Sequence, residues 1–192
     1  MTDVRVLVFA GSLRKASLNH RLAVAGAAAA EAAGAQVSLL RLADYAMPVY
    51  DGDLEEAHGV PEAALALSQE MQSHDAFLIA SPEYNGSIPG AFKNAIDWVS
   101  RPVEGEPSLA AFKAKTVGLM AASPGALGGI RSLNHVRAIL SHVGCLVLGE
   151  QMSLPKAGEA FDEQGVLLSA AAQKRLDALV ARLVQVAAGL KA

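Results

Sequence analysis

Residues 10–19 (AGSLRKASLN) place several hydrogen-bond donors in one short stretch directly after the apolar run VRVLVF. Ser12 and Ser17 carry hydroxyls, Asn19 an amide and Arg14 a guanidinium. If a helix begins here, its first backbone N–H groups are unpaired and its N-terminus carries partial positive charge. Such a stretch favours the binding of a phosphate group. The alternative is that Ser17 only caps the helix and that Arg14 is solvated.

The glycine pattern narrows the kind of phosphate. Gly11 is the only glycine in this stretch, so neither the dinucleotide signature G-x-G-x-x-G nor the nucleotide-hydrolase signature ending in G-K-[ST] is present. The hydroxyls therefore predict a bound monophosphate rather than a triphosphate with magnesium.

A second polar stretch, residues 81–98 (SPEYNGSIPGAFKNAIDW), follows the apolar run AFLIA. Its prolines and glycines make a stiff, non-helical backbone that exposes N–H and C=O groups. Tyr84 offers a flat ring with a polar tip, and Asn85 offers both a donor and an acceptor. This combination suits a planar heterocycle. The alternative is a structural turn in which Ser87 caps the next helix and Pro89 lies in its first turn.

A third stretch, residues 122–131 (ASPGALGGIR), is rich in glycine and follows another apolar run. Glycines allow the backbone to approach a ligand closely, and they equally suit a flexible turn.

The elements that must position these stretches are strands alternating with helices. Apolar, β-branched runs predict the strands, and apolar residues at helical spacing predict the helices. Residues 47–60 are expected to form a polar loop and residues 153–165 a mobile excursion. Strands are expected at 4–9, 36–42, 76–80, 115–121 and 145–148, and helices at 18–33, 61–74, 89–99, 133–143 and 176–183.

This alternation predicts a single α/β domain over residues 1–192, with a doubly wound, five-stranded parallel sheet covered on both faces. The commonest order for five such strands is 2-1-3-4-5, with the switch point between strands one and three. Ligands bind at the carboxyl ends of the strands in such sheets. The three polar stretches are therefore expected to meet at one edge.

Composition excludes several classes of partner. The net charge of -3 is spread along the chain without a basic stripe, which argues against nucleic acid and anionic membrane surfaces. No apolar run approaches the ~20 residues needed to span a bilayer, and the first residues lack the pattern of a signal peptide, so we expect a soluble, cytoplasmic protein. A mean hydropathy of +0.30 predicts a homo-oligomer, a dimer or a tetramer.

Other reactive side chains are assigned structural roles. Cys145, the only cysteine, is expected to be a buried thiol, and Trp98 to lie in the core or an interface. The five histidines lack the spacing of metal ligands, so no metal site is expected. Glu83 and Lys93 are expected to pair across a helix turn.

The stretches GSLRKASLNHRLA and SPEYNGSIPGAFKNAIDW resemble the two signature loops of the NADPH-dependent FMN reductase family, and SPGALGGIR resembles that family's third flavin loop. The likeness spans nearly the whole chain and is greatest to the quinone and chromate reductase type. It implies the flavodoxin-like fold, FMN as cofactor and NADPH or NADH as co-substrate.

The resemblance also implies which residues bind FMN. It puts Ser12, Arg14, Ser17 and Asn19 around the phosphate, Pro82, Glu83, Tyr84 and Asn85 beside the isoalloxazine, and Leu18, Gly86, Ser123 and Gly125 in the same cofactor-binding set. Several relatives have an aromatic residue at the position of Gly86, which predicts a wider pocket over the flavin in this chain.

The implied reaction is hydride transfer from the nicotinamide to the flavin and then to a small-molecule electron acceptor such as a quinone, an azo compound, chromate or free flavin. The cofactor performs this chemistry, so no catalytic side chain is expected. Arg101 and Arg131 are candidates to meet the 2′-phosphate of NADPH. Two alternatives stay open, a flavodoxin-type one-electron carrier and a regulatory or structural module without a cofactor.

Overall fold

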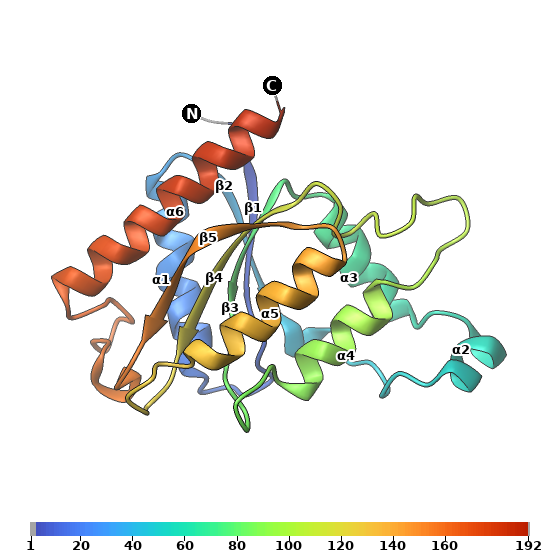
Figure 1. The fold of residues 1–192 in the computed structure, drawn as a ribbon, viewed down its shortest axis with the longest axis horizontal. Coiled ribbons are helices and arrows are strands. Elements are labelled where there is room, and N and C mark those ends of the chain that lie inside the picture. The colour runs from blue at the N-terminus through green and yellow to red at the C-terminus, as the bar shows by residue number, and fades with distance from the viewer. Residues whose placement is uncertain (1–2, 192) are drawn as a thin grey trace.

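The computed structural model describes residues 3–191, and this part of the chain contains a five-stranded sheet in the order β2-β1-β3-β4-β5 (Figure 1). All neighbouring strands pair in parallel, as the alternation of strands and helices predicted. Residues 1, 2 and 192 of the expected domain lie outside the described residues. The strands are β1 Arg5–Ala10, β2 Gln36–Arg41, β3 Ala76–Ala80, β4 Thr116–Ala122 and β5 Leu146–Leu154.

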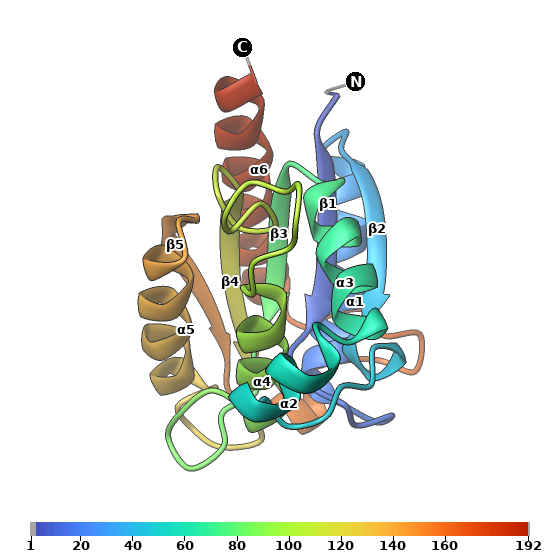
Figure 2. The ribbon, with the colours of Figure 1, turned by 90° about the vertical axis from the view of Figure 1, so that its right-hand side faces the viewer.

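Helices cover both faces of the sheet (Figure 2). Apolar residues of α1 and α6 pack on one face, and those of α3, α4 and α5 on the other. Within residues 3–191 the α-helices are α1 Leu18–Ala32, α2 Gly52–His58, α3 Glu62–Gln72, α4 Gly90–Val99, α5 Ile130–His142 and α6 Ala170–Lys191. Every residue of β3 and β4 is buried, which explains why these strands are continuous apolar runs.

The prediction that residues 47–60 form only a polar loop is wrong, because helix α2 lies within this segment. Asp51 caps this helix by accepting a hydrogen bond from the backbone N–H of Asp53 at 2.9 Å. None of the residues of α2 is buried, so the segment lacks the apolar periodicity from which a helix is predicted. In Figure 1, α2 lies at the end of an arm that projects from the rest of the molecule.

The fifth strand ends at Leu154, whereas the sequence predicted its end at residue 148. It therefore includes the first two residues of the segment 153–165, which was expected to be mobile. The register of its pairing with β4 shifts between Val117 and Leu119. This bulge interrupts β5 after the apolar run CLVL from which the strand was predicted. The following segment is packed against α1. Arg21 donates to the Asp162 carbonyl at 2.7 Å, and its guanidinium lies 4.8 Å from the ring centroid of the buried Phe161.

The loops after β1, β3 and β4 lie together at the carboxyl edge of the sheet, at the lower edge of Figure 1. They contain the three polar stretches whose residue types favour ligand binding. The order of the strands therefore brings these stretches together.

Candidate functional site

The loop after β1 and the first turn of α1 form one wall of a pocket. Ser17 caps α1 by accepting a hydrogen bond from the backbone N–H of His20 at 3.3 Å. Its hydroxyl retains a hydrogen to donate, so capping and ligand binding are compatible. A Cβ on Gly11 would lie 2.7 Å from the ring of Phe92, so only glycine lets this loop pass so close to α4.

This wall presents donors that the protein itself does not use. Within residues 3–191, no hydrogen-bond partner is found for the backbone N–H groups of residues 15–19 or for the guanidinium of Arg14. Arg14 lines the pocket with Ser12 and Ser17. Unpaired N–H groups, a helix N-terminus and a cation together fit a phosphate group.

Asn19 lines the same pocket, but its amide is already paired. Its Nδ2 donates to the Ala122 carbonyl, and its Oδ1 accepts from the Ala122 N–H, both at 2.8 Å. The residue is 4% exposed. Its amide therefore joins α1 to the end of β4, and is not a free donor to a phosphate. A sequence gives no sign of this pairing, because the two residues lie 103 positions apart.

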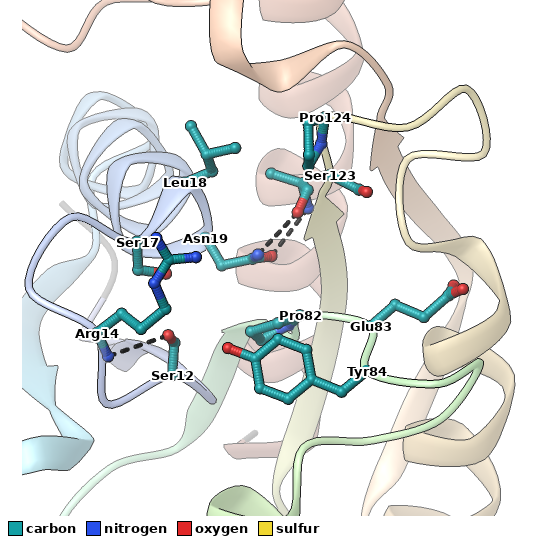
Figure 3. Close-up of a pocket in the computed structure, with 11 residues that line it drawn as sticks. Ser12, Arg14, Ser17, Leu18, Asn19, Pro82, Glu83, Tyr84, Ser123 and Pro124 are labelled. Atoms are coloured by element: carbon teal, nitrogen blue, oxygen red, sulfur yellow. Dashed lines mark hydrogen bonds between the residues drawn. The ribbon is translucent and has the colours of Figure 1, made fainter.

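The loop after β3 forms the opposite wall, with Pro82 and Tyr84. Backbone hydrogen bonds join Tyr84 and Ser87 in both directions, at 3.1 and 3.0 Å. Asn85 and Gly86 lie between them with φ of 51° and 78°. Positive φ at both central residues is the requirement of a type I′ turn, for which Asn-Gly is the preferred sequence. Across the pocket, the hydroxyl end of Tyr84 points toward Ser12 and Arg14 (Figure 3).

Glu83 turns away from the centre of this pocket toward α5 (Figure 3). Its carboxylate accepts from the backbone N–H of Arg131 at 3.0 Å and from the Nε of Arg131 at 2.7 Å. Burial alone raises the pKa of Glu83, but the hydrogen bonds from Arg131 and Ser132 outweigh it and hold this pKa below its ordinary value. The expected pair with Lys93 is wrong, since Lys93 pairs with Asp97 at 2.6 Å.

The loop after β4 closes the pocket between the two walls. Ser123 lines it, and its hydroxyl accepts from the Gly125 N–H at 3.2 Å. The pocket is also lined by Ala122 and Pro124, which were not among the predicted site residues. Their side chains carry no polar group, so residue type offered no signal for them.

The resulting pocket, with the open space at its mouth included, has a volume of about 400 Å³. Of the predicted residues, Asn85, Gly86 and Gly125 lie outside its lining. The predicted residues that line it are Ser12, Arg14, Ser17, Leu18, Asn19, Pro82, Glu83, Tyr84 and Ser123.

Ser87 does not cap α4 as the alternative interpretation had it. Pro89 is the N-cap residue of α4, and the hydroxyl of Ser87 instead lies 2.8 Å from the Nδ1 of His135 on α5.

The two arginines considered for a 2′-phosphate both form ion pairs within the protein. Arg131 pairs with Glu83, and the Nε of Arg101 lies 3.0 Å from the Glu55 carboxylate. Within residues 3–191, no group of three or more His, Cys, Asp and Glu side chains is arranged to hold a metal ion.

Cys145 and Trp98 are structural, as predicted. Cys145 is 7% exposed, its thiol donates to the Phe112 carbonyl, and burial raises the pKa of this thiol to about 12. Trp98 is fully buried and donates its Nε1–H to the Pro48 carbonyl at 2.8 Å.

Comparisons with known proteins agree with one another. The family model for NADPH-dependent FMN reductase matches residues 4–159, which include all three loops of the pocket. The chain is 37% identical over 185 residues to an NAD(P)H-dependent FMN reductase of Pseudomonas aeruginosa, with 92% of this chain and 94% of the relative covered. It is 34% identical over 177 residues to a quinone reductase of Escherichia coli, with 85% and 88% covered.

A solved structure extends this similarity to three dimensions. The flavoenzyme NAD(P)H:(acceptor) oxidoreductase from Paracoccus denitrificans superimposes with a TM-score of 0.78 at 32% sequence identity. The similarity covers 95% of this chain and 96% of that one.

Proposed function

The chain belongs to the NADPH-dependent FMN reductase family, and from this premise we propose that it passes hydride from NADPH or NADH through bound FMN to a quinone or a similar small acceptor. One observation carries the proposal. A wall rich in unused donors at the start of α1 faces a wall of Pro82 and Tyr84 across a single pocket. These two walls match the two ends of FMN, an anionic phosphate and a planar ring.

The residues fit FMN on chemical grounds. Arg14, Ser12 and Ser17, together with the backbone N–H groups of residues 15–19, would hold the phosphate. Pro82, Tyr84 and the 122–125 loop would border the ring. When bound, FMN accepts two electrons as hydride and passes them to an acceptor.

In this proposal the side chains bind and orient, and none of them has to move a proton. Tyr84 is 46% exposed, so the ring wall is open to solvent and leaves room for a nicotinamide and then an acceptor. An open site that takes both in turn predicts ping-pong kinetics. Intersecting double-reciprocal plots would contradict this order.

Quinones are the acceptors we favour, because the Escherichia coli relative is named a quinone reductase. Azo compounds, chromate and free flavin are proposed as further acceptors, since the open ring wall admits molecules of different shape. Steady-state turnover of such a panel with NADPH and with NADH tests this range.

Reduction of the bound flavin by a nicotinamide is the decisive experiment. Anaerobic NADPH or NADH added to the flavin-loaded protein is expected to bleach the flavin absorbance rapidly. Slow or absent bleaching with both would favour a one-electron carrier of the flavodoxin type. Freshly purified protein without flavin absorbance, and without binding of added FMN, would instead favour a module without a cofactor.

Within residues 3–191, no helix combines the length and the apolar character needed to cross a membrane. We further propose that residues 1–192 form one domain and act in the cytoplasm as a homodimer or a homotetramer.

A further inference from the structure

Helix α5 holds the loop after β3 at two points, one helical turn apart. At the first point the Glu83 carboxylate accepts from Arg131 in the first turn of α5. At the second, the Oγ of Ser87 lies 2.8 Å from the Nδ1 of His135. Arg131 and His135 are four residues apart and therefore lie on the same face of the helix. Tyr84 and Asn85 lie between the two points.

The second point fixes the position of the turn relative to α5. Ser87 is bound to Tyr84 by two backbone hydrogen bonds, so fixing Ser87 also fixes the backbone of Tyr84. Asn85 and Gly86, with φ of 51° and 78°, complete a type I′ turn that the Asn-Gly sequence itself favours. A turn held only at Glu83 would be freer to shift as a unit relative to α5. His135 is the side chain on α5 that holds the other end.

We propose that His135 is a positioning residue for the flavin. By holding Ser87 it sets the distance between the ring of Tyr84 and the phosphate-binding loop at the start of α1. This inference rests on the proposed function, because it concerns the placement of the FMN pocket. His135 itself is not among the residues that line the pocket, so it acts through Ser87 and Tyr84.

The pair suits a permanent holding role. A serine hydroxyl both donates and accepts, so it can bond to the Nδ1 of a neutral or a protonated imidazole. An alanine at either position removes the bond. An asparagine at position 135 retains a polar atom bonded to Cγ, where the Nδ1 of histidine lies, so its amide can form a hydrogen bond with the hydroxyl.

The test compares the full-length His135→Ala, Ser87→Ala and double variants with the unmodified protein. FMN is titrated into flavin-stripped protein, and backbone hydrogen exchange is measured for residues 82–90 without FMN. Each single variant is expected to raise the FMN Kd roughly three- to tenfold and to speed exchange of the Ser87 N–H. The double variant is expected to equal the single ones, since both remove the same bond.

Two control variants separate positioning from general damage. His142→Ala removes the other histidine of α5, which lies outside the pocket lining, and is expected to leave the Kd and the exchange unchanged. His135→Asn is expected to restore most of the lost affinity. Far-UV circular dichroism checks that each variant is folded.

Several results would overturn the inference. They are unchanged exchange and Kd in His135→Ala, an effect of His135→Ala that persists in full on top of Ser87→Ala, or a His135→Asn variant as weak as the alanine variant. If the unmodified protein binds no FMN, the proposed function fails, and hydrogen exchange alone then decides whether His135 holds the turn.

Discussion

Individual side chains at the site divide into those that are free for a ligand and those that hold the loops. The guanidinium of Arg14 and the backbone N–H groups of residues 15–19 have no partners within the described chain, whereas the polar groups of the Asn19 and Glu83 side chains are paired. The resemblance had implied that Arg14, Asn19 and Glu83 all bind the cofactor. Their hydrogen-bond partners in the structure show which of them are free for a ligand and which hold the loops. Each of these roles can be tested.

Arg14→Ala is expected to weaken FMN binding because it removes a charge-assisted hydrogen bond to the phosphate. The loss should be about 1.5 to 3 kcal/mol, a rise in Kd of about 10- to 150-fold. Fluorescence titration of the flavin measures it. Lys15→Ala is the matched control, since it removes a neighbouring charge that does not line the pocket. An equal loss in both variants would show that net charge, not Arg14, holds the phosphate.

Asn19→Ala is expected to destabilise the fold even without FMN. It leaves the buried N–H and C=O of Ala122 unpaired, which should lower the free energy of unfolding by roughly 2 to 4 kcal/mol. Urea denaturation of the flavin-free protein measures this loss. Asn134→Ala, an exposed site on α5, is the control and should change stability by less than about 0.5 kcal/mol. Normal stability with weakened FMN binding would instead make Asn19 a direct ligand.

At the scale of elements, helix α5 is capped by a residue from another loop. Its N-cap residue is Gly129, which has no side chain to accept from the first N–H groups. Glu83 supplies that acceptor, accepting from the N–H groups of Arg131 and Ser132 at 3.0 and 3.4 Å. The carboxylate also lies at the positive end of the helix dipole. The Glu83 side chain therefore caps the N-terminus of α5 and at the same time holds the loop after β3 against this helix.

Glu83→Gln tests this cap through its dependence on pH. The pKa of Glu83 is lowered in the folded protein, so the charged form stabilises the fold at neutral pH. That contribution is lost as pH falls from the ordinary glutamate pKa of about 4.3 through the lower folded value. Glutamine is expected to cost about 1 to 2 kcal/mol at neutral pH. The difference from the unmodified protein should shrink toward zero in acid.

Urea denaturation across this pH range measures the difference. Glu163→Gln, at an exposed position in the 155–169 segment, should show no such pattern. A destabilisation by Glu83→Gln that is the same at every pH would contradict the capping role.

At the scale of the whole molecule, FMN joins loops from three strands and should stabilise the fold as a unit. At a free concentration of about one hundred times its Kd, FMN adds about 2.7 kcal/mol. For a chain of 192 residues this corresponds to a rise in Tm of roughly 5 to 10 °C. Differential scanning calorimetry measures it. Riboflavin, which lacks the phosphate, should raise Tm less at equal concentration. An equal rise would show that the α1 wall does not hold a phosphate.

The shape of the molecule also bears on its assembly. Helix α2 projects on an arm and has no buried residue of its own, and a helix this short is marginal in water without packing (Figure 1). We therefore expect a second copy to cover it. Sedimentation at micromolar concentration should give a species heavier than the 19.8 kDa monomer. Monomer alone would contradict this expectation.

The sequence by itself determined the alternation of elements, the parallel sheet and the three loops of the site. Buried strands and helix faces need apolar residues at fixed spacing, and these local patterns can be read along the chain. The polar residues of GSLRKASLN and SPEYNG stood out because they interrupt such patterns next to buried strands. The same reasoning about parallel sheets predicted the strand order, and the structure confirms it.

Only the tertiary structure decided which of those polar residues are free. Asn19 forms its hydrogen bonds with Ala122, 103 positions away in the sequence, and Glu83 with Arg131, 48 positions away. No local sequence pattern indicates partners that lie so far apart. Helix α2 and the bulged end of β5 escaped prediction for a related reason. Both lie at the margin of the fold, where few side chains are buried and the apolar signal is weak. A hydrogen bond between distant residues depends on where the packed elements place their atoms, and this placement is a property of the whole fold.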